Sequence, residues 1–160
     1  NKYKQTPIFN KISKKLIKFS RKLFNKKFSL IIPGMAIGIN NSKRTAYQWH
    51  QEKPYYKNIS SIHYQFPILN PVNISNGTMS VLSGSHNLGY IRSVKNIKLT
   101  KKSINSFIPK NIKSIRKKFP ERAINMSPRD VVLFNQNIIH RTNKNITPKV
   151  RFAGIIRLFI

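Results

Sequence analysis

The feature that most constrains the fold is a series of short β-type runs separated by turn signals. Segments rich in β-branched and aromatic residues are bounded by clusters such as Asn40-Asn41-Ser42, Asn70-Pro71 and Asn76-Gly77. Short strands with such punctuation are typical of sandwiches and barrels. The pattern therefore predicts a mainly β, jelly-roll fold. The predicted strands are residues 28–39, 44–52, 59–69, 77–83, 130–140 and 149–159.

One helix precedes these strands. Over residues 5–27, apolar side chains recur at helical spacing among lysines, which predicts an amphipathic helix that covers one side of a sheet. Its apolar residues include Ile12, Leu16, Phe19, Leu23 and Phe24. The same pattern is also typical of a basic helix on a membrane surface.

The chain has 160 residues, enough for one domain with a real core. We expect a single domain over 1–160, with a helical flank at 1–27 and a jelly-roll core at 28–160. Within the core, 88–127 lacks clean periodicity and is expected to form a basic helical and loop insertion, with a short helix near 110–118. The chain starts with Asn rather than Met and ends inside a predicted strand, so we expect a fragment of a longer protein.

Composition excludes several classes of protein. Without cysteine, the chain has no disulfide framework and no thiolate metal site. The longest apolar run, from Phe28 to Ile39, is too short and interrupted to span a bilayer. The absence of a signal-peptide cleavage pattern predicts a cytoplasmic location.

Acidic residues number only 3, and one of them, Glu52, lies two positions after His50. In a β-strand, residues i and i+2 point to the same face, so the imidazole and the carboxylate are expected to aim at one point. Such a pair is half of the two-histidine, one-carboxylate site of non-haem iron oxygenases. By itself the His-x-Glu motif is weak evidence.

A second group of residues lies near the C-terminus. His140 follows the β-type run 130–134, and Arg151 comes eleven residues later among apolar neighbours. A buried arginine is costly unless it meets an anion, and its planar fork suits a carboxylate. Thr142, two residues after His140, is expected to add a hydroxyl donor for the same carboxylate. A histidine followed by such an arginine is what an iron enzyme with a dicarboxylate co-substrate requires.

Together these motifs resemble the phytanoyl-CoA dioxygenase family of Fe(II)/2-oxoglutarate oxygenases. The resemblance runs over roughly residues 30–160 and implies a double-stranded β-helix of the cupin kind. Its motifs are Trp-His-Gln-Glu at 49–52, Asn-Gly-Thr-Met at 76–79, Ser-Gly-Ser-His at 83–86, Arg-Asp-Val-Val-Leu-Phe at 129–134, and the segment from His140 to Arg151. Two departures are Glu where Asp is more usual, and Ser-Gly-Ser-His where Pro-Gly-Ser-His is typical.

The resemblance also implies roles for individual residues. His50, Glu52 and His140 would bind iron. Arg151 and Thr142 would hold the distal carboxylate of 2-oxoglutarate, with Gln51 beside the site. Further residues expected to line the site are Phe66, Trp49 and His86. For His86, a role in a structural hydrogen bond is at least as well supported. His63 is interpreted as an ordinary strand histidine.

The formal net charge is +28, with lysines concentrated in 11–27 and 95–118. The favoured interpretation is a solvated lysine-rich face, followed by an anionic substrate or surface. Specific nucleic-acid binding is not expected, because no RNA-recognition, helix-turn-helix or zinc-finger pattern accompanies the charge. We expect a small substrate, no transmembrane segment, and at most weak contact with a membrane surface; the abundance of lysine favours an anionic substrate.

The function implied by the resemblance is that of an Fe(II)- and 2-oxoglutarate-dependent dioxygenase of the hydroxylase type. With O2 as the other co-substrate, it would oxidise a small organic molecule and release succinate and CO2. Two alternatives stay open. In the first alternative, the chain is an inactive or truncated jelly-roll relic; in the second, it is a basic module that binds nucleic acid or a membrane surface.

Overall fold

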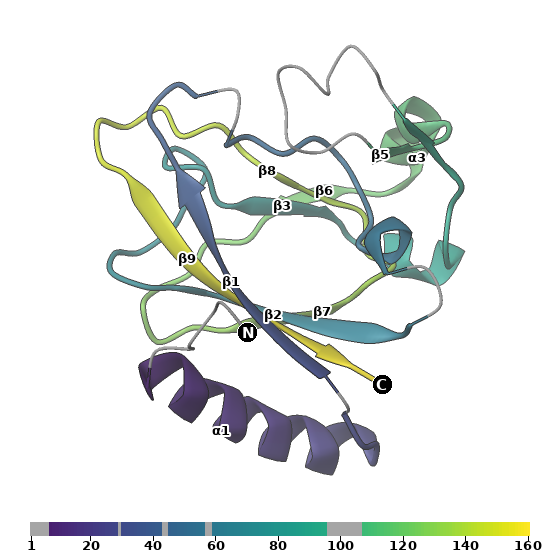
Figure 1. Cartoon of the computed structure of the whole chain (residues 1–160). Helices are drawn as coiled ribbons and strands as arrows, with labels where there is room; N and C mark the ends of the chain where they lie inside the picture. Colours follow the sequence, from purple (N-terminus) through teal and green to yellow (C-terminus); the bar gives the residue numbers. More distant parts are fainter. Residues whose placement is uncertain (1–6, 29, 43–44, 57–58, 96–106) are drawn as a thin grey trace.

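The computed structural model describes residues 7–28, 30–42, 45–56, 59–95 and 107–160. Across these residues two antiparallel sheets face each other, and one helix covers the outer side of the larger sheet (Figure 1). Their strand orders, β1-β9-β2-β7 and β6-β3-β8, confirm the mainly β, jelly-roll prediction. No helix in the described parts of the chain is long and apolar enough to cross a membrane.

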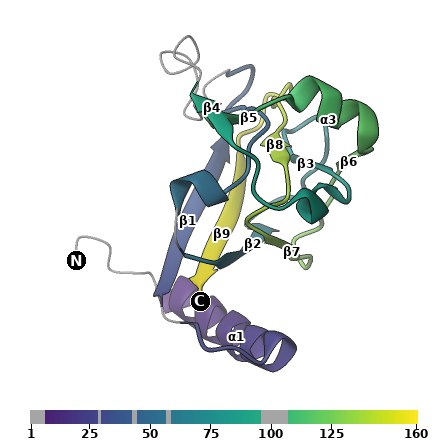
Figure 2. The same cartoon turned by 90° about the vertical axis from the view of Figure 1, so that its right-hand side faces the viewer.

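The strands of the larger sheet are β1 (Leu30–Gly38), β9 (Arg151–Phe159), β2 (Ser61–Pro67) and β7 (Val132–Asn135). Those of the smaller sheet are β6 (Glu121–Ala123), β3 (Met79–Leu82) and β8 (His140–Thr142). A separate pair, β4 (Ser93–Lys95) and β5 (Phe107–Pro109), leads into the helix α3 (Ile112–Lys118). Figure 2 shows the larger sheet apart from the smaller sheet, with α3 on the side of the smaller one.

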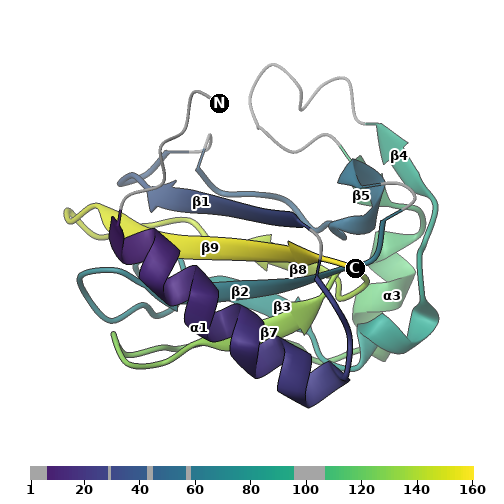
Figure 3. The ribbon, with the colours of Figure 1, turned by 60° about the horizontal axis from the view of Figure 1, so that its bottom comes forward.

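The helix α1 (Pro7–Phe24) lies diagonally across the larger sheet (Figure 3). Its inner face packs Ile12 and Leu16 against a buried apolar cluster of the sheet. One polar contact fixes the helix to β2, because the Ser20 hydroxyl lies 2.6 Å from the Tyr64 hydroxyl. The cluster under α1 consists of Phe28, Ile62, Tyr64, Phe66, Ile156 and Leu158.

The alternation of side chains along β2 and β9 separates this core from a cavity. Even-numbered residues such as Tyr64 and Ile156 belong to the cluster under α1. Odd-numbered residues such as Gln65, Ile155 and Arg157 line a cavity on the opposite face of the sheet. Because successive residues of a strand point to opposite faces, one strand supplies both the core and the site.

The predicted helix at 5–27 and the strands at 28–39, 59–69, 77–83 and 149–159 correspond to α1, β1, β2, β3 and β9. The short helix near 110–118 corresponds to α3. Parts of the predicted segments lie outside the described residues, namely 5–6, 29, 44 and 96–106.

The predicted strand at 44–52 is wrong for its described part. His50 forms one isolated bridge with His140, and the backbone then leaves the sheet. The amides of Glu52 and Lys53 both donate to the Gln136 carbonyl, and a 3-10 turn follows at Lys53–Tyr55. Pro54 has no amide hydrogen with which a ladder could continue.

Two other boundaries differ from the prediction. The single strand predicted at 130–140 is two strands, β7 and β8, joined by a turn, and they belong to different sheets. The segment 88–127, predicted as an insertion, also supplies β6, which pairs with β3. This part of the chain therefore contributes to the smaller sheet as well as to the α3 region.

Candidate metal centre

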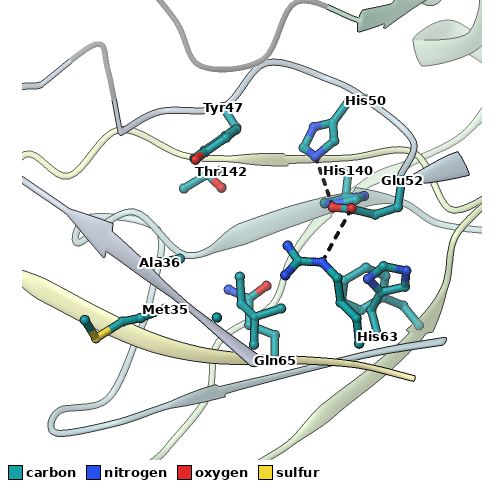
Figure 4. Close-up of a pocket in the computed structure, with 13 residues that line it drawn as sticks. Met35, Ala36, Tyr47, His50, Glu52, His63, Gln65, His140 and Thr142 are labelled. Atoms are coloured by element: carbon teal, nitrogen blue, oxygen red, sulfur yellow. Dashed lines mark ion pairs between the residues drawn. The ribbon is translucent and has the colours of Figure 1, made fainter. Parts of the chain in front are cut away.

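His50 and His140 are brought together by the backbone. His50 N donates to His140 O at 2.9 Å and His140 N donates to His50 O at 3.0 Å, so the two residues face each other across one bridge. Their ring centroids lie 4.2 Å apart. Glu52 reaches the same point from the start of the 3-10 turn (Figure 4). Its approach depends on the chain leaving the sheet after His50, and not on strand alternation.

The three side chains present one potential ligand atom each. Glu52 Oε1 lies 3.6 Å from His50 Nε2 and 3.6 Å from His140 Nε2. All three ligand atoms lie within 4.8 Å of one another. Two imidazole nitrogens and one carboxylate oxygen are the donor set of a mononuclear non-haem iron site, and this spacing leaves room for an ion between them.

The other nitrogen of each ring is used by the backbone. His50 Nδ1 lies 2.6 Å from Gln48 O, and His140 Nδ1 lies 3.1 Å from Ile138 O. A carbonyl oxygen only accepts, so each Nδ1 carries the hydrogen and the lone pair of each neutral ring is on Nε2. These contacts orient the metal-binding nitrogens toward Glu52, as outer-shell hydrogen bonds do in metal sites. The residues present therefore fit a divalent metal.

The ionisation states also suit a metal. Burial alone would raise the pKa of Glu52, but the imidazoles of His140 and His50 beside it hold it well below its usual value. Burial and the neighbouring His50 lower the pKa of His140. At neutral pH Glu52 is therefore a carboxylate and His140 is a neutral imidazole, which are the forms that bind metal ions.

The triad lies in a cavity of about 150 Å³ between the two sheets. Thr142 also lines this cavity. His63 is a strand histidine as expected, and its buried ring also reaches the cavity and stacks on Phe134. The remaining lining residues are Gly34, Met35, Ala36, Tyr47, Gln65, Ile155 and Arg157.

Arg151 lies at the start of β9, at the other end of the strand from Arg157. Its side chain is buried, and none of its guanidinium nitrogens has a hydrogen-bond partner among the described residues. It does not line the metal cavity but borders a neighbouring one, beside Thr147 and Asn76. Burial lowers the pKa of Arg151, yet a guanidinium stays charged at neutral pH. A buried, unpaired cation of this kind is suited to an anionic ligand.

Four predicted residues do not line the metal cavity. Gln51 is fully buried, and its amide donates to the carbonyls of Gly89 and Asn137 and accepts from the amide of Ile91, so its side chain is used up in supporting this loop. Its expected place beside 2-oxoglutarate does not agree with these contacts. The other three are Phe66, Trp49 and His86.

Each of these three has a physical reason for its position. Phe66 is one residue past Gln65 on β2, so strand alternation places it in the core under α1. Trp49 packs with Leu82 and Ile139 in a second core cluster, while the adjacent His50 faces the cavity. His86 is exposed in the 3-10 turn Ser85–Leu88.

Sequence reasoning missed Arg157, Gln65 and Tyr47 as cavity residues. For Arg157 a signal was present, because it lies six residues after Arg151 and so has the same parity on a strand. Tyr47 lies in the irregular segment before His50, where no strand pattern could assign a face.

Residues 25–153 match the model of a family described as phytanoyl-CoA dioxygenase. No curated protein matches the chain in sequence. Among solved structures, the fold is similar to EctD from S. alaskensis with 2-oxoglutarate and 5-hydroxyectoine, at 17% identity and a TM-score of 0.74, over 97% of this chain and 53% of that one. EctD has also been solved with bound Fe.

Two further structures share the fold. EvdO2 from Micromonospora carbonacea var. aurantiaca complexed with 2-oxoglutarate has 14% identity and a TM-score of 0.67, over 81% of this chain and 51% of that one. The non-heme alpha ketoglutarate dependent epimerase SnoN has 12% identity and a TM-score of 0.65, over 91% and 52%. The chain thus spans about half the length of these proteins.

Proposed function

The chain belongs to the phytanoyl-CoA dioxygenase family, and from that premise we propose that it is an Fe(II)- and 2-oxoglutarate-dependent oxygenase that hydroxylates a small organic substrate. The observation that carries the proposal is the convergence of His50 Nε2, His140 Nε2 and Glu52 Oε1 in a buried cavity. The solved structures of EctD with Fe and with 2-oxoglutarate support the choice of metal and co-substrate.

His50, Glu52 and His140 would hold the iron. Because the protein would supply only three ligands, the metal would remain accessible to the co-substrate and O2. When bound, these groups supply the oxidising chemistry, in which 2-oxoglutarate is converted to succinate and CO2. The carbonyls of Gln48 and Ile138 hold the two rings in the ligating tautomer. The assembled triad argues against the relic alternative, which predicted a site that does not form.

Arg151 and Thr142 would hold the distal carboxylate of 2-oxoglutarate. Thr142 lines the metal cavity. Arg151 begins the strand β9, which forms one wall of that cavity, and its donors have no partner among the described residues. A bidentate contact with a carboxylate would satisfy the guanidinium and orient the co-substrate. Gln51 is left out of this role, because it supports the loop that contains Gly89 and Ile91.

The direct test is an anaerobic titration with Fe(II) and 2-oxoglutarate, monitored by the weak visible charge-transfer band of the chelate. We expect a saturable band in wild-type protein and none in Glu52→Ala. The exposed carboxylate Glu121 provides a matched control, since Glu121→Ala removes the same group outside the cavity. A folded wild-type protein without the band would refute the proposed function.

A further inference from the structure

Arg157 has an unusual position for a cation. It projects from β9 into the metal cavity, and its side chain is only 19% exposed. The nearest anion is Glu52, whose Oε2 lies 3.8 Å from Arg157 Nε, which is too long for a hydrogen bond. Arg157 Nε is buried without a hydrogen-bond partner among the described residues.

Space for this guanidinium is provided by β1. A Cβ atom at Gly34 would lie 3.2 Å from Arg157 Nη1, so any larger residue there would crowd the side chain. Arg157 is also the one lysine or arginine among the described residues that line the cavity. The cavity therefore holds a single cation in a defined place, while the many lysines of the described chain lie outside it.

No other side-chain carboxylate is available to Arg157. The chain has 3 acidic residues. Glu121 forms ion pairs with Arg141 and Arg116 on the smaller-sheet side of the molecule, and Asp130 accepts a hydrogen bond from the Ser127 amide at 2.7 Å. Glu52 is then the only acid in the cavity, and in the proposed function its charge serves the metal.

With metal and co-substrate bound, the site would carry one unmatched positive charge. In the proposed function Arg151, which lies outside the metal cavity, pairs with the distal carboxylate of 2-oxoglutarate. The two positive charges of Fe(II) and the one of Arg151 are then matched by the single negative charge of Glu52 and the two of 2-oxoglutarate. Arg157 is left over as a partly buried cation, because its nearest anion, Glu52, would already serve the metal. Burying an uncompensated charge is costly, and two cations in one cavity repel unless an anion lies between them. The loaded cavity is thus complementary to one further anionic group.

Resting on the proposed function, we propose that Arg157 is the substrate-recognition residue of this cavity and that the substrate is a small organic carboxylate. The planar guanidinium binds a carboxylate through two parallel hydrogen bonds, which would fix the substrate's orientation beside the metal. One defined residue, and not the bulk charge of the chain, would then select an anionic substrate.

The test uses the protein loaded anaerobically with Fe(II) and saturating 2-oxoglutarate. The probes are short monocarboxylic acids, each paired with its primary amide, and the readouts are perturbation of the chelate band and the thermal midpoint. We expect acids to bind and amides not to bind. Arg157→Met should weaken acid binding by at least about 30-fold, because a charge-assisted bidentate contact is lost. Arg157→Lys should retain part of the affinity, since it keeps the charge without the fork.

Arg141→Met is the matched control, because Arg141 pairs with Glu121 outside the cavity and should leave acid binding unchanged. Equal binding of acids and amides, or no binding of either, would overturn the inference. So would a loss of 2-oxoglutarate affinity in Arg157→Met with acid binding unchanged, because Arg157 would then serve the co-substrate. The chelate band separates the two claims. If it forms and acids do not bind, this inference alone fails; if it does not form in folded protein, the proposed function fails.

Discussion

The metal cavity and the helix α1 place charge in opposite ways. The cavity contains one carboxylate, Glu52, and one arginine, Arg157, both largely buried. The outer side of α1 carries exposed cations and no acid. These cations are Lys11, Lys14, Lys15, Lys18, Arg21 and Lys22.

Burial, and not the number of charges, decides how much each charge matters in these two regions. Water screens the charges on α1 at physiological ionic strength, so each contributes little to stability. In the cavity each charge is desolvated and must be matched by a partner or a ligand. We therefore expect substitutions of the same residue types to differ sharply between the two regions.

The largest effect should come from the triad. His50→Ala or His140→Ala should abolish tight Fe(II) binding, because each removes a ligand and opens a coordination position. Glu52→Asp should be milder than Glu52→Ala, since it keeps a hard oxygen on a side chain shorter by one methylene. Anaerobic Fe(II) titration measures these differences. Full metal affinity in a folded Glu52→Ala protein would show that the carboxylate is not a ligand.

Arg151→Ala should weaken 2-oxoglutarate binding by about 2–5 kcal/mol, or roughly 30-fold to several thousand-fold, and leave Fe(II) affinity nearly unchanged. Thr142→Ala should cost less, about 0.5–3 kcal/mol, for one hydrogen bond to a charged group. Apparent 2-oxoglutarate affinity at saturating Fe(II) is the measurement. Arg21→Ala on α1 makes the same change on the surface and should have no effect. An Arg151→Ala protein that binds 2-oxoglutarate normally would remove Arg151 from the site.

His63 predicts a pH effect on stability. Burial lowers the pKa of His63 to about 4, from an ordinary value near 6.5. The unfolded chain therefore binds a proton that the folded protein does not between these values, so the free energy of unfolding should fall as pH falls from about 6.5 to about 4. His63→Phe should reduce this slope by up to about 1.4 kcal/mol per pH unit. Urea unfolding at several pH values tests it, and an unchanged slope would contradict the assignment.

On α1 the two faces should behave differently. Leu16→Ala should lower the free energy of unfolding by about 1–3 kcal/mol, because Leu16 packs on the core cluster of the sheet. Lys15→Ala, one residue earlier on the exposed side, should change it by no more than about 0.5 kcal/mol. Urea denaturation of the pair measures both. Equal effects would mean that the outer side of α1 is not simply solvated.

We expect the weakest effect from the exposed lysines, in their binding to nucleic acid or to anionic membranes. If they form a solvated face, binding to DNA or anionic vesicles should be weak, independent of sequence and nearly lost at moderate salt. Filter binding and vesicle sedimentation across a salt series provide the measurement. A sequence-preferring DNA complex that persists at physiological salt would favour the binding-module alternative.

By itself the sequence determined the β-rich class, the helix α1, and a short set of residues that can bind a metal or a carboxylate. These features follow from local rules, because periodicity sets which faces are apolar and residue type sets which atoms can bind a metal. The spacing of His50 and Glu52 indicated half of a metal site, and the resemblance to a known family added His140 as the third ligand. The structure brings the three ligand atoms within 4.8 Å of one another.

Only the tertiary structure decided which neighbours of these residues face the cavity. Gln51 and Trp49 flank His50 in sequence but are held in the loop and in a second core cluster. Phe66 was displaced from the site by one step of strand alternation, and Arg157 was brought into it by the pairing of β9 between β1 and β2. The physical reason is that a side chain's direction depends on strand register and on the exit of the backbone at Pro54, and both are set by contacts between residues far apart in the sequence.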